Sequence, residues 1–116
     1  MTNYDLCVHV DQNDPGLLGL ALNNIANYMA ALPGETFRVR LVANGPAVQL
    51  FKSGATPHDA RIAELAAKGV TFALCANALK AFSVDKQALV SGCEVVSAGV
   101  VELVQLQRAG FAYIKP

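Results

Sequence analysis

Charged residues are scarce in this sequence, and neither sign is in excess. Asp, Glu, Lys and Arg make up 16% of the 116 residues, whereas an ordinary soluble domain has roughly 25%. Nine basic residues balance nine acidic ones, and no basic run is present that could displace counterions from a nucleic-acid backbone. We therefore expect no direct nucleic-acid partner, and we expect some of the surface not to face water.

Long apolar runs are also missing. A membrane-spanning helix needs about 18 consecutive apolar residues, and each apolar stretch here is broken much earlier by Asn, Gln, Glu or Gly. The N-terminal segment MTNYDLCVHV lacks the basic start, apolar middle and cleavage site of a signal peptide. The sequence thus predicts a cytoplasmic protein with no membrane segment, and its length suits a single domain over residues 1–116.

Cysteines are few and irregularly spaced. Cys7, Cys75 and Cys93 form no C-x-x-C pair and no Cys/His ligand pattern. This spacing argues against a disulfide framework and against a zinc site. We expect three free thiols and no bound metal.

Strand-like and helix-like runs alternate along the whole chain. Residues 70–75 are apolar throughout, which is typical of a central strand in a parallel sheet, whereas Arg38 and Arg40 alternate with apolar residues and predict a strand near an edge. Asp14 and Pro15 provide the start signal of the first helix. The pattern predicts a three-layer α/β/α sandwich around a five-stranded, mostly parallel sheet. The expected strands are 4–10, 36–45, 70–75, 94–96 and 111–115, and the expected helices are 15–32, 56–68, 76–82 and 97–109, with a further helical piece near 85–89.

In an open α/β sheet, ligands bind beyond the carboxyl ends of the strands. Polar and small residues follow each of the first four predicted strands, and these are the candidate site residues. They are His9 and Asp11, Asn44 and Gly45, Cys75 and Asn77, and Ser97 and Gly99.

Cys75 stands where a strand passes directly into a helix. Amide groups at a helix N-terminus favour an anionic sulfur, so this position suits a reactive thiolate or a persulfide. Small neighbours, Ala76 and Ala78, leave room for a partner sulfur to approach. The alternative is that Cys75 only fills the end of a buried strand, as unreactive cysteines often do.

The other candidates have structural interpretations of their own. Cys7 lies in mid-strand and is expected in the core, while Cys93 lies at the opposite end of the sheet from Cys75. His9 is more often a hydrogen-bonded structural residue than a base, and Asn44 with Gly45 suits a turn that lets backbone approach a ligand.

Several enzyme classes are excluded by spacing. A phosphatase or rhodanese loop needs an Arg about six residues after its cysteine, and residue 81 is Ala. A thioredoxin needs a second cysteine, a receiver domain needs Asp where Cys75 stands, and HVDQNDPG is no flavodoxin phosphate loop. No Walker loop and no G-x-G-x-x-G motif is present.

Four segments together resemble the DsrE/DsrF-like family of small sulfur-relay proteins over nearly the whole chain. They are HVDQNDPGLLGLALNNIANYM, VRLVANGPAVQLF, GVTFALCANALKAF and VVSAGVVELVQLQRAGFAYIKP. The most specific parts are the V-x-x-x-x-G-P turn, the C-x-N step and the closing L-Q-x-x-G-[FY]-A-Y-I-x-P. The family pattern usually has Thr or Met where Ala78 stands and often has His where Asn44 stands, so polar contacts in this pocket differ.

The resemblance implies a persulfide carrier of sulfurtransferase type. Sulfur would be held on Cys75 and passed from a donor protein to an acceptor protein, without metal or organic cofactor. Asn77 would stabilise the anion, and His9 would assist proton transfer if it faces the pocket. The resemblance also implies a homo-oligomer, a trimer or a hexamer, which agrees with the low charge content. The alternative from another class is a non-catalytic small-ligand-binding or assembly module in which Cys75 only lines the pocket.

Overall fold

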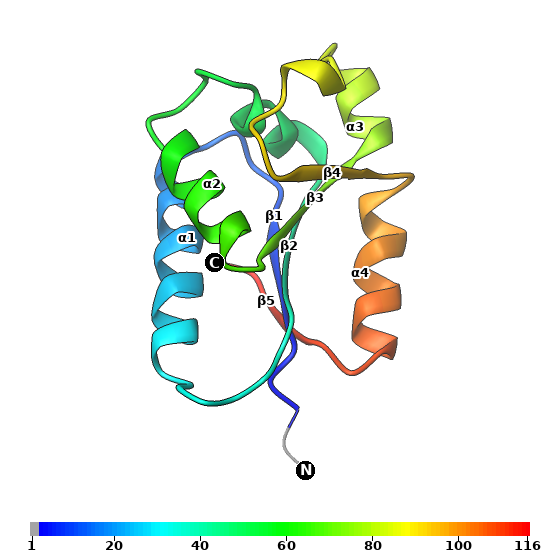
Figure 1. Ribbon diagram of the computed structural model, residues 1–116. Helices are drawn as coiled ribbons and strands as arrows, with labels where there is room; N and C mark the ends of the chain where they lie inside the picture. Colours follow the sequence, from blue (N-terminus) through cyan, green and yellow to red (C-terminus); the bar gives the residue numbers. More distant parts are fainter. Residues whose placement is uncertain (1–2) are drawn as a thin grey trace.

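The chain folds into a central sheet with helices on both faces (Figure 1). The computed structural model describes residues 3–116. Its elements in chain order are β1 (Leu6–Val10), α1 (Pro15–Ala30), β2 (Val39–Ala43), η1 (Gly45–Phe51), α2 (Asp59–Ala67), β3 (Thr71–Cys75), α3 (Ala76–Ala81), η2 (Lys86–Ala88), β4 (Cys93–Val96), α4 (Gly99–Arg108) and β5 (Ala112–Ile114). No helix within these described residues is both long enough and apolar enough to cross a membrane.

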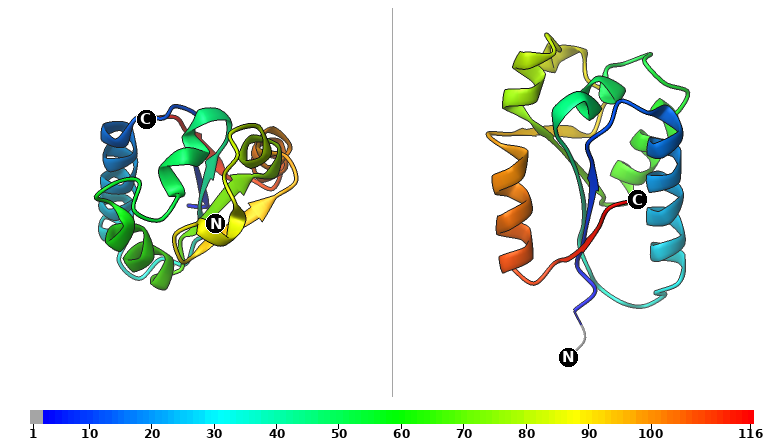
Figure 2. Two further views of the ribbon diagram at one scale, coloured as in Figure 1. Left: turned by 90° about the horizontal axis from the view of Figure 1, so that it is seen from above. Right: turned by 180° about the vertical axis from the view of Figure 1, so that it is seen from behind.

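Helices α1 and α2 cover one face of the sheet and α4 covers the other (Figures 1 and 2). The strand order is β4-β3-β2-β1-β5, and each pair of neighbouring strands runs parallel. These features confirm the predicted three-layer α/β/α sandwich with a five-stranded sheet. Strand β3 lies inside the sheet between β2 and β4, as its continuous apolar run indicates.

The prediction that β2 lies near a sheet edge is wrong, because β2 is the middle strand. Its alternating arginine does not face water. The guanidinium of Arg40 instead forms ion pairs with Glu94 of β4 and with Glu102 of α4, the latter at 2.9 Å. Arginine alternates with apolar residues both in a solvated edge strand and in an inner strand whose arginine pairs with carboxylates. The alternation alone does not distinguish the two.

The two faces of the sheet carry side chains of different size. On the α1 and α2 face, Leu18, Leu22 and Ile25 of α1 are fully buried in one large apolar cluster. On the α4 face, the sheet contributes the smaller Cys7, Val42 and Ala73, which pack with α4 and with Phe111. Because short side chains separate α4 from the strands, the helix can approach the sheet closely.

Helix starts follow the sequence signals in part. Asp14 caps α1 as predicted, since its carboxylate accepts hydrogen bonds from the backbone N–H groups of Gly16 and Leu17. Helix α2 starts at Asp59, three residues later than the Thr56-Pro57 signal suggests, and the Thr56 hydroxyl accepts a hydrogen bond from the N–H of His58. The 3-10 helix η1, directly after Asn44, is missing from the sequence prediction.

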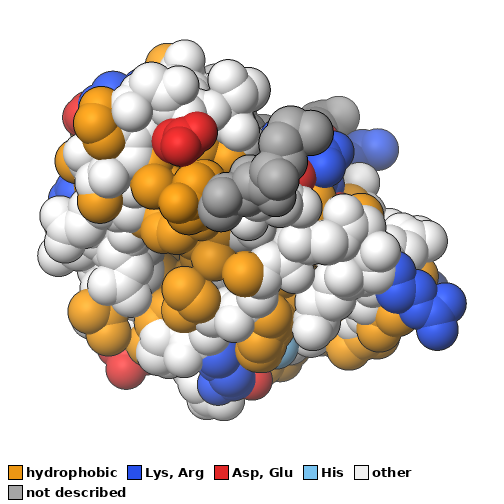
Figure 3. Space-filling model, turned by 90° about the horizontal axis from the view of Figure 1, so that it is seen from below, with side chains coloured by type: hydrophobic (Ala, Val, Ile, Leu, Met, Phe, Trp, Pro, Cys, Tyr) orange, Lys and Arg blue, Asp and Glu red, His pale blue; other side chains and the backbone are white. Residues whose placement is uncertain are grey.

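A hollow of about 360 Å³ lies at the amino ends of the strands, far from the predicted site. Arg38 and Arg40 line it from the sheet side, and Glu102, Gln105 and Leu106 line it from α4. Figure 3 shows this end of the molecule, where apolar side chains gather between charged ones. Arg40 and Glu102 are already paired with each other, so the hollow offers no free charge of theirs to a ligand.

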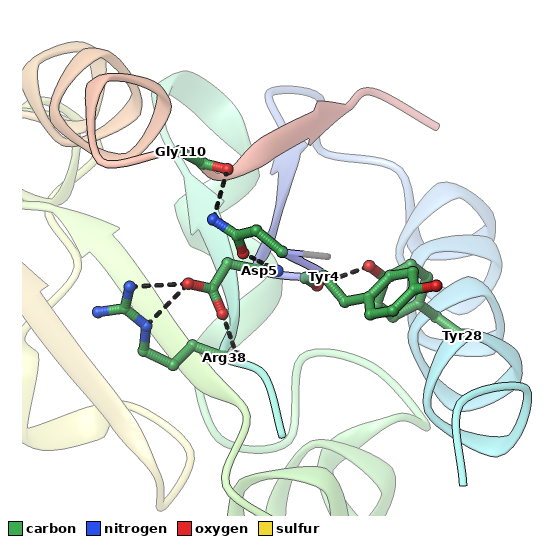
Figure 4. Close-up of polar contacts among 6 residues, drawn as sticks. Tyr4, Asp5, Tyr28, Arg38 and Gly110 are labelled. Atoms are coloured by element: carbon green, nitrogen blue, oxygen red, sulfur yellow. Dashed lines mark hydrogen bonds and ion pairs between the residues drawn. The ribbon is translucent and has the colours of Figure 1, made fainter. Parts of the chain in front are cut away.

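The carboxylate of Asp5 joins the start of β1 to the chain before β2 (Figure 4). It accepts hydrogen bonds from the backbone N–H of Arg38 at 2.7 Å and from the Arg38 guanidinium at 2.7 and 3.1 Å. Side-chain hydrogen bonding from Arg38 holds the pKa of Asp5 below its ordinary value. The ionised carboxylate therefore stabilises the folded state.

Removal of this charge should weaken the fold in a pH-dependent way. Asp5→Asn is expected to lower the free energy of unfolding at pH 7 by about 1.5–3 kcal/mol, the range for hydrogen bonds to charged groups. Because the folded-state pKa is lowered, the carboxylate's contribution is complete above the unfolded-state pKa of about 3.9 and is lost as the pH falls through the folded-state value. Urea unfolding at pH 7 and in acid measures both effects.

The matched control is Glu64→Gln, which removes an exposed i,i+4 pair with Lys68 on α2. Exposed pairs of this kind contribute little, so we expect a change below about 0.5 kcal/mol. Equal loss of stability in the two variants at pH 7 would contradict the role assigned to Asp5.

Candidate functional site

Three of the predicted site residues lie on one face of the sheet at its carboxyl end. Cys7, Val42 and Ala73 face α4, and side chains two residues apart on a strand point to the same face. His9 and Cys75 lie two residues beyond Cys7 and Ala73, and Asn44 lies two beyond Val42. His9, Asn44 and Cys75 therefore share the α4 face, on three adjacent strands or directly after them.

Gly99 brings the start of α4 into direct contact with this row. A Cβ atom added to Gly99 would lie 2.9 Å from Cβ of Asn44 and 3.3 Å from Cβ of Cys75. The first of these distances is shorter than two carbon atoms tolerate without movement. A residue without a side chain is thus required where the α4 backbone passes over Asn44 and Cys75.

Helix α3 begins directly after Cys75, and helix α4 begins close to the same residue. No side chain caps either start. Cys75 is itself the N-cap residue of α3, and Ala98 is the N-cap residue of α4. Neither makes a side-chain cap hydrogen bond, so the first N–H groups of both helices lack the partner that Ser, Thr, Asp or Asn provides. The sequence pattern predicts a last helix that begins at Ser97, but Ser97 is exposed and lies one residue before the N-cap position.

Cys75 is buried but not sealed. Its exposed fraction is 7%, and Ala76 beside it is half-buried. Small groups surround the sulfur on the α4 side, because Gly99 has no side chain there.

His9 connects the row to the far edge of the sheet. Its Nε2 lies 2.8 Å from Oδ1 of Asn44, and its Nδ1 lies 2.6 Å from the hydroxyl oxygen of Tyr113 on β5. Tyr113 is absent from the candidate residues found by sequence reasoning. No local signal marks it, because its position beside β1 depends on the strand order, which the sequence pattern leaves open.

Other predicted residues lie at this end without joining the row. Asn77 is exposed on α3. Gly45 starts η1 with a φ of +55°, and its Cα faces the backbone oxygen of Asp11. The Asp11 carboxylate pairs with Lys115 at 3.2 Å. Burial alone would raise the pKa of Asp11, but the hydrogen bond and charge of Lys115 outweigh it and hold this pKa below its ordinary value.

The other two thiols differ from Cys75 in their surroundings. Cys7 is fully buried in mid-strand, as predicted, and burial raises its pKa. Cys93 pairs with Phe72 at the start of β3, far from Cys75, and burial together with the charge of Asp59 raises its pKa to about 12. Both groups therefore remain neutral thiols near pH 7 and are poor nucleophiles. Within residues 3–116, no three His, Cys, Asp or Glu side chains gather as potential metal ligands.

A parallel α/β sandwich with a cysteine at the end of its third strand, beside two helix starts, defines a class of small thiol-bearing proteins. The model of the DsrE/DsrF-like family matches residues 5–116. The chain belongs to this family, as the sequence motifs indicate.

Solved structures share the fold of this chain. The protein of unknown function MTH1491 from Methanobacterium thermoautotrophicum is 34% identical, with a TM-score of 0.90 over 98% of this chain and 100% of that one. The ychN protein from E. coli shares the fold at 18% identity, with a TM-score of 0.82 over 97% and 99% of the two chains. No curated protein matches this chain in sequence.

The contact at Gly99 can be tested by adding one methyl group. Alanine normally stabilises a helix relative to glycine by up to about 1 kcal/mol, but Gly99→Ala should lower the free energy of unfolding by about 1–3 kcal/mol because the helix must move away from Asn44. Urea unfolding measures this difference.

Gly16→Ala is the matched control in the first turn of α1, where the new Cβ would meet only the end of the Asp14 side chain, at 3.3 Å. We expect this variant to equal or exceed the wild type in stability. If Gly99→Ala behaved in the same way, α4 would not be held against the sheet by this contact.

Proposed function

We propose that the protein is a sulfur carrier that holds sulfane sulfur on Cys75 as a persulfide. The supporting observation is the position of this thiol at the uncapped starts of α3 and α4, where a Cβ added to Gly99 would lie 3.3 Å from the Cβ atom of Cys75. Helix N-termini stabilise negative charge through free N–H groups and the helix dipole. The proposal extends the family assignment, which by itself suggests only a sulfur-relay protein.

The proposed reaction needs no metal, organic cofactor or oxidant. The Cys75 thiolate attacks the outer sulfur of a donor persulfide, R–S–SH. The new sulfur–sulfur bond forms while the bond within the donor breaks, and the donor leaves as the thiolate R–S⁻. Cys75 now carries –S–SH, which is an anion for as long as its proton is lost to solvent. When that proton has returned, an acceptor thiolate attacks the outer sulfur by the same step, and Cys75 leaves as a thiolate.

In every step of this transfer, the negative charge lies on a sulfur atom. The attacking thiolate, the bound persulfide after loss of its proton, and the thiolate left after transfer all carry one negative charge near the same atoms. A fixed set of backbone donors can therefore stabilise each state in turn. This explains why helix starts, and no additional titrating group, would suffice for a carrier.

The remaining site residues have proposed roles at the rim. Asn77 and Ser97 are exposed beside the two helix starts, where they could contact the donor or acceptor protein. Gly45 and Gly99 would let backbone approach the site closely, and Asn44 with His9 would provide polar contacts. The partners would be proteins that bear a persulfide or an acceptor thiol.

Burial of the thiol favours a second candidate function. Cys75 is only 7% exposed and packs with the main apolar cluster. These features suit a binding or assembly module in which the cysteine lines a pocket and never reacts.

Mass spectrometry separates the two candidates. After incubation with glutathione persulfide, the wild-type protein should gain the mass of one sulfur atom, and Cys75→Ser should gain none. Cys93→Ser and Cys7→Ala should gain sulfur like the wild type, because burial raises the pKa of both thiols and neither takes part. A wild-type protein that gains no sulfur would support the binding or assembly module.

We also propose that the protein forms a homo-oligomer, a trimer or a hexamer, through the outer face of α4. Val100, Val101 and Val104 are 61%, 49% and 48% exposed on this helix, and soluble monomers rarely leave adjacent apolar side chains uncovered. The low charge content agrees with a covered surface. We propose the cytoplasm as its location, because free thiols persist in a reducing compartment.

Charges placed on this face should separate the subunits. The double variant Val101→Lys/Val104→Lys is expected to run as a monomer in light scattering coupled to size-exclusion chromatography, because an ammonium group buried at an interface is strongly unfavourable. Leu20→Lys on α1 is the matched control, since Leu20 is also 48% exposed. An oligomer that persisted in the double variant would assign the interface to another surface.

A further inference from the structure

One guanidinium group on the middle strand binds the chain on both sides of the β4–α4 connection. Nε of Arg40 donates a hydrogen bond to Oε2 of Glu102 on α4 at 3.0 Å, and Nη2 of Arg40 lies 2.9 Å from the same oxygen. Nη2 also donates to Oε1 of Glu94 on β4. A guanidinium can only donate and an ionised carboxylate can only accept, so the direction of each bond is fixed by the groups themselves.

This cluster of charges lies largely beneath α4. The side chains of Arg40 and Glu102 are 22% and 16% exposed, whereas the side chain of Glu94 is 50% exposed. The next residues on this face of the sheet, Val42 and Ala73, are fully buried and apolar. Replacing a buried ion pair with apolar side chains of similar volume is often neutral or stabilising, so the pair is weak evidence for a role in stability alone. What the pair adds to apolar packing is direction, because charged hydrogen bonds constrain both distance and angle.

Apolar contacts alone define the position of α4 along the sheet only loosely. Hydrophobic contact is non-directional. The strands beneath α4 contribute short side chains, and Gly99 contributes none, so few ridges and grooves interlock between helix and sheet. Among residues 3–116, the ion pair of Arg40 with Glu102 is the one that joins α4 to a strand. This pair therefore sets how far α4 extends along β2.

The ion pair affects the candidate site because Glu102 lies one turn after Gly99. Residues three apart on a helix share a face, so both residues face the sheet. A Cβ added to Gly99 would lie 3.3 Å from the Cβ atom of Cys75. A displacement of Glu102 relative to Arg40 is thus transmitted through one helical turn to the backbone beside Cys75.

Glu94 attaches the other side of the connection to the same guanidinium. Figure 1 shows β4 passing almost directly into α4, and only Ser97 and Ala98 lie between the two elements. The connection therefore cannot swing outward without breaking an ion pair. The negative charge of Glu102 alone would oppose an anionic sulfur at the same helix start, and its pairing with Arg40 offsets this charge.

We propose that Arg40 is a positioning residue that holds the start of α4 over Cys75 through its ion pairs with Glu102 and Glu94. This inference rests on the proposed carrier function and identifies the residue that keeps one of its two helix starts in place. Arg40 does not touch the reactants, because it pairs with Thr71, four residues before Cys75 and about 13 Å away along β3. A helix start that moves away from the sulfur loses its interaction with the anion, since the dipole effect falls off within the first turn.

The position of α4 can be measured without any sulfur chemistry. Arg40→Met keeps the length of the side chain and removes its charge. In ¹H–¹⁵N spectra, the backbone amide signal of Gly99 should shift in this variant. The amide hydrogen of Glu102, which is bonded to the Ala98 carbonyl oxygen at 3.1 Å, should exchange faster with solvent relative to the amides of α1. An unchanged signal and an unchanged exchange rate would overturn the proposal.

Arg38→Met is the matched control for a general loss of stability. Arg38 belongs to the same segment of chain, but its guanidinium pairs with Asp5 before β1 and not with α4 or β4. This variant should be less stable than the wild type, yet it should keep the Gly99 amide signal in place. Arg40→Lys is a milder second variant, because a compact ammonium keeps the charge but lacks the rigid fork that binds two carboxylates at once. It should shift the Gly99 signal in the same direction as Arg40→Met, by a smaller amount.

The functional consequence is measured as the rate of sulfur uptake from glutathione persulfide, followed by mass spectrometry at pH 7. Arg40→Met should take up sulfur about two- to fivefold more slowly, the effect of losing the interaction of one helix start with an anion. Arg38→Met should take up sulfur at the wild-type rate. Equal slowing in the two variants would assign the effect to stability and overturn the positioning role.

Exchange of the two charges tests positioning against mere presence of an arginine on β2. Arg40→Glu gathers three carboxylates and should slow uptake further than Arg40→Met does. In Arg40→Glu/Glu102→Arg, the guanidinium stands on α4 and faces the carboxylates of β2 and β4, so the link and the net charge of the cluster are restored. The double variant should recover most of the lost rate, a non-additive effect expected of residues in direct contact. A double variant slower than Arg40→Glu alone would overturn the proposal.

The outcomes separate this inference from the carrier function on which it rests. A wild-type protein that took up no sulfur would overturn the carrier function, and the amide signals of the Arg40 variants would still show whether Arg40 positions α4. Uptake at the wild-type rate in Arg40→Met would overturn the positioning role and leave the carrier function standing.

Discussion

The packing of Gly99 against Asn44 and Cys75 is the constraint on which the site depends. A helix can lie this close to a sheet only where both surfaces are thin, and here the sheet contributes Cys7, Val42 and Ala73 beneath α4. The short side chains of the strands and the glycine of the helix are thus both needed for this close approach. Together they bring the first turn of α4 to the end of β3, where a thiol stands.

The starts of α3 and α4 lose some local stability because no side chain caps them. A helix start without a capping side chain loses about 1 kcal/mol relative to one with Ser, Thr, Asp or Asn. A side chain caps α1 at Asp14, whereas α2 at His58, α3 at Cys75 and α4 at Ala98 have no side-chain cap. Departures of this kind from local rules concentrate at functional sites.

The sequence predicts the sheet and the position of the thiol, but it does not predict the order of the strands. The apolar run before Cys75 and the helical pattern after it locate the thiol, and two-residue alternation brings His9 and Asn44 to the same face. Strand order is not contained in such local patterns. Tyr113 therefore escapes detection, because only the pairing of β5 with β1 brings it to His9. Arg40 misleads for a similar reason, since its carboxylate partners lie far away in sequence.

The remaining charges near the site are arranged so that they do not oppose an anionic sulfur. Asp11 follows β1 at the same end of the sheet, and an unpaired carboxylate there would disfavour a second negative charge. Lys115, just after β5, forms an ion pair with it at 3.2 Å. The two charges cancel at a distance and leave the helix starts to determine the local potential. Strand β5 therefore supports the site twice, through Tyr113 on His9 and through the lysine that follows it on Asp11.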